Sequence, residues 1–431
     1  MKKIIILLFL SIFFLSEANA TSLLQALSQA YKNNPKINAE RESLEISKEE
    51  INEAKSEFLP TITISGYLSD ENTTRQTDRK GVVTESSVEP SQQKILIEQS
   101  LYEGNSRYAN LKKSNVGLEL AKLKLKKIEQ EILFQSVEVY TDLVLNNKKV
   151  KINQENVNLF KRQVETNKGR LERGEIGLTD LAQSEASLSG AKAKLIEAEN
   201  KLMISKINYE KTIGSISNYK NLFTIGSFNY ELPRSLSLAN QISKKENPDL
   251  NIAILELEQS KQDIVIAKSE LLPNAKLSFE LKANQDLSST VDERDQEILK
   301  AEASWPIYSG GKSTAGLKKS KRLKYQKELL LEDAKKSNEA LVTNAWSDFK
   351  SSKSFLISTQ SQVKAAGIAN EGITQEYESG AGRSTLEVIQ SNSLLLDAKI
   401  SLANSKRDFL LSQYKLLLAV GRLTGSNLNL N

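Results

Sequence analysis

The residue types of this chain limit the chemistry it can perform. Its 431 residues include no histidine and no cysteine. A Ser-His-Asp or Cys-His centre, a histidine metal site, a disulfide and thiol chemistry are therefore excluded. The acidic residues are interspersed with lysine and arginine and do not cluster on a predicted strand. We expect no catalytic residues, no bound metal and no cofactor, so the chain is predicted not to be an enzyme.

Polar residues gather at two positions where glycine interrupts a predicted helix. Gly174 and Gly177 mark the first position, and Gly380 and Gly382 mark the second. Glycine often ends a helix because it adopts a left-handed backbone without strain, and helix capping alone would explain these residues. The run 380–385 is superficially similar to a phosphate-binding turn, but it lacks a preceding strand and a lysine. We therefore expect two helix–helix turns without a nucleotide site.

The beginning of the chain has the features of a secretory signal peptide, assigned to residues 1–20. Lys2 and Lys3 precede an almost wholly apolar stretch over residues 4–15, and Ala18-Asn19-Ala20 fits a cleavage site. The stretch is too short for a good membrane span, and no later segment is long and apolar enough for a transmembrane helix. A formal net charge of +5, from interspersed residues of both signs, predicts no nucleic-acid binding.

Two copies of one unit make up the rest of the sequence. Residues 34–60 align without a gap onto residues 247–273. Within them the string Ala-Lys-Ser-Glu occurs at 54–57 and again at 267–270. Such ordered self-similarity indicates a duplicated structural unit. The predicted domains are a first repeat at 21–220, an inter-repeat linker at 221–233 and a second repeat at 234–431.

Proline positions delimit the predicted helices. None of the seven prolines lies between residues 91 and 232 or after residue 306, and proline is unfavourable inside a helix. Two blocks of about 65 residues, 106–170 and 312–376, are predicted as helices about 100 Å long. In the first block, apolar residues recur in steps of four and seven, which is coiled-coil spacing. Shorter helices are expected over 25–57, 178–212, 238–270 and 386–420.

Four segments alternate apolar and polar residues with period two, as strands do. Ile62 and Ile64 alternate with Thr63 and Ser65, and the same pattern follows Pro273 and precedes Pro306. Each predicted strand has about ten residues, the length that a tilted strand needs to cross a bilayer. The paired strands are expected to be joined by polar loops at 70–92 and 284–297.

Four strands in one chain cannot close a barrel, and an open edge in lipid leaves unpaired backbone groups that each cost several kcal/mol. Three copies would supply twelve strands and an open lumen, which small polar and charged residues on one strand face favour. The predicted fold class is an α+β membrane protein with two internal repeats. Its long antiparallel helices form a coiled-coil barrel, and each chain contributes four strands to a shared trimeric transmembrane β-barrel.

Six kinds of string stand out along the chain: Asn34-Pro35, residues 54–60 and their copy, Gln99-Ser100-Leu101-Tyr102, Arg173-Gly174-(x5)-Asp180, Pro306-Ile307-Tyr308-Ser309-Gly310-Gly311 and Tyr377-Glu378-Ser379-Gly380. In their order and duplication they resemble the TolC family of outer-membrane efflux and secretion channels, and the resemblance covers nearly the whole mature chain.

The resemblance implies a homotrimer in the outer membrane lipid, with a helical tunnel in the periplasm. Such a channel-tunnel gives passive exit to substrates of a tripartite efflux pump or a type I protein secretion system. Its implied partners are a periplasmic adaptor, also called a membrane fusion protein, and an inner-membrane pump or ABC transporter. The resemblance does not determine which cargo is exported or which inner-membrane protein is the partner.

The same resemblance gives the two turns a role as the periplasmic tip of the tunnel. Adaptor docking is implied at Gly174, Gly177, Gly380 and Gly382. A periplasmic gate is implied at Thr179, Asp180, Tyr377, Arg383, Glu387 and Gln390. One residue is inserted after Gly380, which shifts the register of Arg383. Gln390 falls where some relatives carry an inward-facing acid, so we expect a carboxylate ring at Glu387.

A periplasmic coiled-coil adaptor or structural protein is the alternative. It accounts for the long helices, but it does not account for the four strands or for the duplication.

Overall fold

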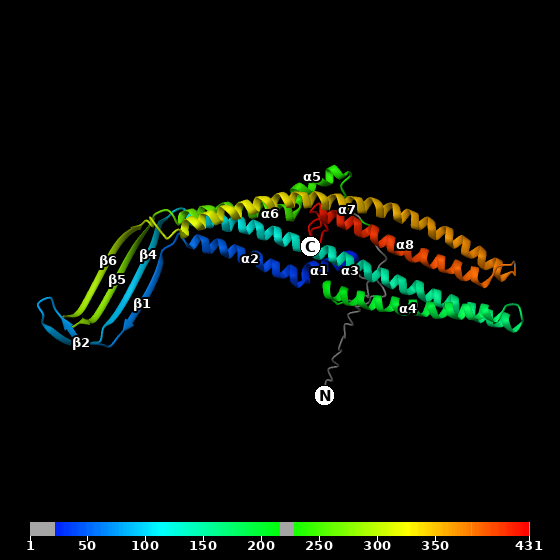
Figure 1. The fold of residues 1–431 in the computed structure, drawn as a ribbon, viewed down its shortest axis with the longest axis horizontal. Coiled ribbons are helices and arrows are strands. Elements are labelled where there is room, and N and C mark those ends of the chain that lie inside the picture. Colours follow the sequence, from blue (N-terminus) through cyan, green and yellow to red (C-terminus); the bar gives the residue numbers. More distant parts are fainter. Residues whose placement is uncertain (1–21, 216–227, 229, 381, 431) are drawn as a thin grey trace, which may run out of the picture. The chain divides into compact units, whose positions relative to one another are not determined.

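The computed structural model describes residues 22–215, 228, 230–380 and 382–430, so the predicted signal peptide and most of the predicted linker lie outside the described residues. Long helices and antiparallel strands make up the chain (Figure 1). It divides into two compact units, and each unit draws on both repeats. One unit comprises residues 39–127 and 247–338 and contains the strands. The other, which is helical, comprises the described parts of 1–38, 128–246 and 339–431.

The two repeats contain the same series of helices. The first has α1 (Leu23–Asn33), α2 (Pro35–Ser56), α3 (Ser106–Glu172) and α4 (Leu178–Thr212), and the second has α5 (Leu236–Glu246), α6 (Pro248–Ser269), α7 (Lys312–Glu378) and α8 (Thr385–Ala419). Corresponding helices have equal lengths of 11, 22, 67 and 35 residues. The predicted long helices are thus confirmed. Within the described part of the chain, no helix is long and apolar enough to span a bilayer.

The single helices predicted over 25–57 and 238–270 are each two helices. The breaks fall at Asn34 and Asn247, which have extended backbone conformations with ψ of 124° and 123°. Each asparagine precedes a proline that begins the next helix. Proline disfavours the helical conformation of the residue before it and is well suited to the first helical position. The physical signal was therefore present in the sequence.

The short helices α1 and α5 pack at corresponding places in the helical unit. Ala26 and Ala30 of α1 are fully buried beside Tyr140 of α3 and Tyr209 of α4. In the second repeat, Ala239 of α5 is fully buried in a cluster with residues of α7 and α8. Small residues on the short helices allow close helix packing, so the core of each repeat is built in the same way.

Four strands form an antiparallel sheet in the order β1 (Thr61–Leu68), β4 (Ser91–Glu103), β5 (Asn274–Ser288) and β6 (Val291–Ser304). They lie side by side in Figure 1. The predicted loops were wrong. Residues 70–92 contain a second antiparallel pair, β2 (Glu71–Thr77) and β3 (Val83–Val88), and most of 284–297 continues β5 and β6. Backbone pairing holds these segments as strands although polar residues occupy both faces.

The strand register separates an apolar face of the sheet from a polar one. Ile62, Ile97, Phe279 and Leu299 lie opposite one another in a row across the four strands. Directly opposed residues share a face, so their side chains form an apolar row. Ile62 and Leu299 are 67% and 71% exposed in the single chain. This face is therefore built to meet something other than the chain's own core.

The opposite face of the sheet carries charged pairs between strands. Lys94 of β4 lies 3.2 Å from Glu280 of β5, and Lys276 of β5 lies 3.2 Å from Glu98 of β4. Lys282 also pairs with Glu280. Cross-strand pairs of opposite charge stabilise a sheet face that stays in contact with water.

Candidate functional site

The turn between α3 and α4 is closed by contacts within the turn itself. Gly174 has a positive φ of 75°, and the amide of Glu175 donates to the carbonyl of Arg170 at 2.9 Å. This is a Schellman helix end, which requires the left-handed conformation that glycine adopts readily. The Glu175 carboxylate accepts hydrogen bonds from Arg173 at 2.6 Å and from Arg170 at 3.2 Å. The hydrogen bond from Arg173, followed by its charge, lowers the pKa of Glu175.

Helix α4 begins without a capping side chain, because its N-cap residue is Gly177. The carboxylate of Asp180 reaches back and accepts a hydrogen bond from the Gly177 amide at 3.3 Å. Asp180 is half-buried, whereas Thr179 beside it is exposed. The sequence-predicted gate residue Asp180 is thus used within its own chain to begin a helix.

The turn between α7 and α8 has a complete capping box. Gly380 ends α7 with a φ of 75°. Ser384 is the N-cap of α8, and its hydroxyl accepts from the Glu387 amide at 3.3 Å. The Glu387 carboxylate in turn accepts from the Ser384 amide at 2.8 Å. These reciprocal bonds satisfy two amides that a helix start would otherwise leave unpaired.

Arg383 joins both sides of this second turn. Its Nε donates to Glu376 at 2.6 Å, and its Nη1 donates to Glu387 at 2.9 Å. The Ser384 amide, and after it Arg383, lower the pKa of Glu387. Gln390 lies one turn further along α8 and is exposed. The side chain of Glu387 is itself 40% exposed, so its carboxylate remains accessible to ions.

Tyr377 connects the second turn to helix α3. Only 4% of its surface is exposed. Its hydroxyl donates to Asn167 Oδ1 of α3 at 2.9 Å and lies 3.2 Å from the hydroxyl of Thr385. The guanidinium of Arg170 stacks over its ring at 4.6 Å from the centroid. Tyr377 therefore fastens the end of α7 and the start of α8 to α3, with buried polar contacts and a cation–π contact.

The expected contacts among Asp180, Tyr377 and Arg383 do not form within a single chain. Among the described residues, no hydrogen bond or ion pair joins Asp180 to either of the other two. Contacts between copies of the chain are a separate question. Tyr377 instead uses Asn167, a residue that sequence reasoning missed.

A signal for Asn167 is nevertheless present in the sequence. Val157, Phe160 and Val164 precede it along α3 in steps of three and four, and all are buried. Asn167 continues this spacing and is fully buried. A polar residue at a core position of a coiled coil marks a place where a specific partner is required.

The described residues hold no group of three or more potential metal ligands. The chain belongs to the outer membrane efflux protein family, whose sequence pattern matches residues 26–215 and 240–422. It is therefore an outer-membrane channel protein and not an enzyme. The resemblance to the TolC family is confirmed, and the alternative of an adaptor or structural protein has no support.

Individual relatives agree with this assignment. The chain is 26% identical to the outer membrane efflux protein BepC of Brucella suis, over 96% of this chain and 88% of the relative. It is 22% identical to the outer membrane protein TolC of Escherichia coli, over 99% and 88% of the two chains. The crystal structure of the Campylobacter jejuni CmeC outer membrane channel has a TM-score of 0.83, covering 93% of this chain and 86% of that one at 17% identity. The predicted fold class is confirmed.

Proposed function

We propose that three copies of this chain form one exit channel that works with a periplasmic adaptor and an inner-membrane pump or ABC transporter. The observation that carries the proposal is that the four-stranded sheet has two unpaired edges. In the described residues, β1 and β6 each pair with one other strand of this sheet, so each has a free edge. Pairing β6 of one copy with β1 of the next would close a twelve-stranded barrel.

The two faces of the sheet support this use. In a closed barrel, the apolar row of Ile62, Ile97, Phe279 and Leu299 would meet lipid. The charged pairs on the other face would line a water-filled lumen. The assembly is tested by native mass measurement of detergent-solubilised protein together with conductance in planar bilayers. Trimers that form pores are the expected result, and a stable monomer with pore activity would contradict the proposal.

The β2–β3 hairpin supplies a test of orientation. Its turn is held by Asp78, whose carboxylate accepts from the amides of Lys80 and Val82 at 2.8 and 2.9 Å. The segment is polar and exposed, so it should tolerate insertion. We expect an epitope inserted near Lys80 to be detected on intact cells. Detection only after the outer membrane is broken would contradict this orientation.

The gate belongs to the same proposal. Tyr377 and Asn167 would hold the tip of the tunnel closed within each chain. Arg383 and Asp180 would add contacts between neighbouring copies in the trimer. Charge-assisted bonds of this kind contribute about 1 to 3 kcal/mol when sheltered from water, and threefold symmetry triples the effect. Glu387 would supply a ring of three carboxylates that favours cations.

The glycine turns would receive the adaptor. Gly174, Gly380 and Gly382 have positive φ angles, and no atom lies within 4 Å of the space where their side chains would extend. Their conformation and open surroundings leave room for a partner to approach the backbone. Replacing Gly382 with leucine should block adaptor capture in a pull-down assay, and unchanged capture would remove this turn from the docking surface.

A further inference from the structure

Two lysines face each other directly on the polar side of the four-stranded sheet. Lys94 of β4 is the register partner of Lys282 of β5. Their row continues to Ser65 of β1 and Gln296 of β6, so it contains no acidic residue. Directly opposed side chains on a sheet have Cβ atoms about 5 Å apart, and like charges at that distance destabilise the pairing. The row therefore costs stability, and packing alone does not explain it.

One carboxylate serves both of these lysines. Glu280 lies two residues before Lys282 on β5, on the same face of the sheet. Its carboxylate pairs with Lys94 Nζ at 3.2 Å and also with Lys282. Across the strands that the structure describes, neither lysine has a second acid within ion-pair distance. Because two ammonium groups share one carboxylate, the cluster keeps a net positive charge.

Arg294 of β6 adds a further positive charge one row nearer the turn between β5 and β6. It is exposed and lies opposite Asn284, on the same face as the two lysines. The adjacent acids Glu293 and Asp295 lie on the other face, because successive residues of a strand alternate. Asp292 falls in the irregular pairing beside the turn, outside these rows. The row of Arg294 therefore adds to the positive charge of the lysine row.

Charges near the start of β5 and the end of β6 balance one another. Lys276 pairs with Glu98 at 3.2 Å, and Lys300 pairs with Glu302. Each of these lysines has a carboxylate of its own. The excess positive charge of the polar face is therefore concentrated in the two adjacent rows nearer the β5–β6 turn.

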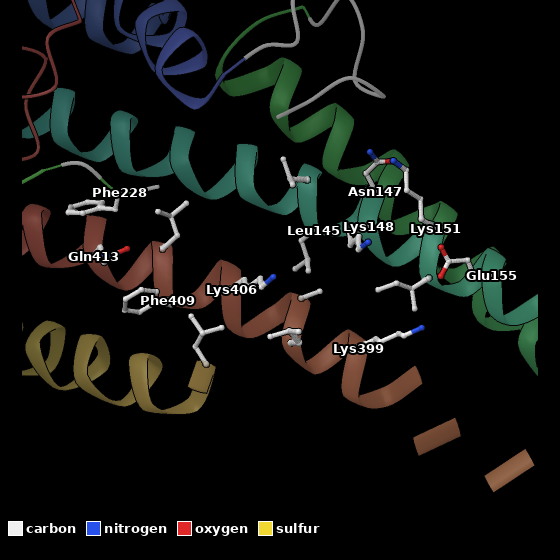
Figure 2. A pocket seen from close by; sticks show the side chains of 16 residues that line it. Leu145, Asn147, Lys148, Lys151, Glu155, Phe228, Lys399, Lys406, Phe409 and Gln413 are labelled. Carbon is white, nitrogen blue, oxygen red and sulfur yellow. The ribbon is translucent and has the colours of Figure 1, made fainter. Parts of the chain in front are cut away.

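Lysines on the helices are not opposed in this way. Lys399 and Lys406 of α8 line the groove between α3 and α8, as Figure 2 shows. They are seven residues apart along one helix, a separation of about 10 Å. A solvated helix face explains such spacing, whereas it does not explain two lysines placed directly opposite each other.

We propose that Lys94, Lys282 and Arg294 form an anion-binding ring in the barrel lumen, whose ligands are oxyanions with two or more negative charges. The proposal rests on the proposed function, because three copies must close the barrel to place three such clusters around one lumen. Rings of lysine and arginine select anions in pores, and a narrow lumen focuses their potential. Both side chains also bind phosphate oxygens through charge-assisted hydrogen bonds. This ring is opposite in sign to the carboxylate ring proposed for Glu387.

The test uses the full-length detergent-solubilised protein in planar bilayers, with pyrophosphate as the probe. Pyrophosphate added to the barrel side should reduce the single-channel current. The concentration that halves the current should rise as salt is added, because salt screens the charges of the ring. Acetate, with one negative charge, should leave the current unchanged at the same concentrations. No block by pyrophosphate, or equal block by acetate, would overturn the proposal.

Neutralising the opposed lysines gives the decisive comparison. Lys94→Gln with Lys282→Gln should raise the half-blocking concentration of pyrophosphate by about tenfold or more. The matched control is Lys276→Gln with Lys300→Gln, which removes the same charge from the same face but from lysines that have their own carboxylates. The control should raise the half-blocking concentration by less than about twofold. Equal effects of the two double variants would show that only the total charge of the lumen matters and would overturn the ring.

A further variant covers the case in which the lysine substitutions prevent folding. Arg294 is exposed, so Arg294→Gln should fold as the wild type does. It should raise the half-blocking concentration of pyrophosphate by about threefold to fivefold, and an unchanged value would also overturn the proposal. Wild-type recordings separate this inference from the proposed function. A protein that forms no pores would contradict the proposed function, whereas pores that pyrophosphate does not block would contradict the anion ring alone.

Discussion

The two helix turns occupy corresponding places in the repeats but are held differently. The α3–α4 turn is closed by glycine and by arginine–glutamate pairs within the turn. The α7–α8 turn is fastened to α3 through Tyr377 and Asn167. At the position of Tyr377 the first repeat has Leu171, which has no hydroxyl to donate. The first repeat therefore has only the contacts within its turn, whereas the turn of the second repeat is also bonded to α3.

The two turns also differ in the sign of the charged residue near the end of the first helix. Arg170 near the end of α3 corresponds to Glu376 near the end of α7. In the first turn Arg170 meets an acid, Glu175, and in the second turn Glu376 meets a base, Arg383. Each turn therefore has an arginine–glutamate pair, but the two partners do not correspond in the repeats, since Glu175 aligns with Ala381. In a ring of copies, turns of opposite pattern are suited to contact one another.

Removing Asn167 should have the largest effect among changes at the two turns. Asn167→Ala leaves the buried Tyr377 hydroxyl without its acceptor on α3 and should lower the free energy of opening there by about 1 to 3 kcal/mol. Hydrogen exchange of the amides at 160–172 measures this quantity. In a double-mutant cycle with Tyr377→Phe, the coupling should be about 1 kcal/mol. Zero coupling would mean that the hydroxyl and the amide act separately.

Substitutions at the N-caps of α8 and α4 should have smaller effects on stability, and these effects should be of opposite sign. Ser384→Ala should destabilise the start of α8 by about 1 kcal/mol, because it removes the side-chain half of the capping box. Gly177→Ser should stabilise the start of α4 by a few tenths of a kcal/mol, since serine supplies the missing acceptor. Thermal unfolding of the two variants checks both signs. A loss of stability in both would show that Gly177 is required for its backbone.

Much of this fold could be predicted from the sequence, because strong local signals set it. Proline-free blocks defined α3 and α7. Period-two alternation located β1 and those parts of β4, β5 and β6 in which apolar and polar residues alternate. The hairpin β2–β3 was missed for a physical reason. Period-two alternation requires one face to be buried, and residues such as Arg75 and Thr84 are polar on strands that are mostly exposed.

The contacts at the turns were harder to predict. Gly174 and Gly380 identified both turns, because glycine ends helices by a local rule. The bond between Tyr377 and Asn167 joins residues 210 positions apart. No local rule selects Asn167 over Asp180 as the partner, since the choice depends on the rotation of α3 against α7. The polar residue at a buried heptad position was the available evidence.

A pH titration should give the smallest effect. The pKa of Glu387 is lowered, so its contribution to the turn is present above its unfolded pKa and is lost only as pH falls through the lower, folded value. Block of the pore by divalent cations should therefore persist below the usual pKa of glutamate, and Glu387→Gln should weaken it at every pH above the folded pKa of Glu387. Glu175→Gln, in the other turn, should leave the block unchanged. Equal effects of both substitutions would contradict a ring formed by Glu387.

Single-channel conductance in planar bilayers tests the central claim most directly, namely that Tyr377 and Arg383 of the α7–α8 turn hold the channel closed, whereas Leu171 and Glu175 of the α3–α4 turn do not. The double variant Tyr377→Phe with Arg383→Ser removes the Tyr377 hydroxyl and the Arg383 ion pairs from the second turn, and Leu171→Ala with Glu175→Ser changes the first turn. The first double variant should raise conductance several-fold, because it removes contacts that contribute about 1 to 3 kcal/mol per chain to the closed state. The second should leave conductance at the wild-type level. Wild-type conductance in both variants, or an equal rise in both, would contradict the claim.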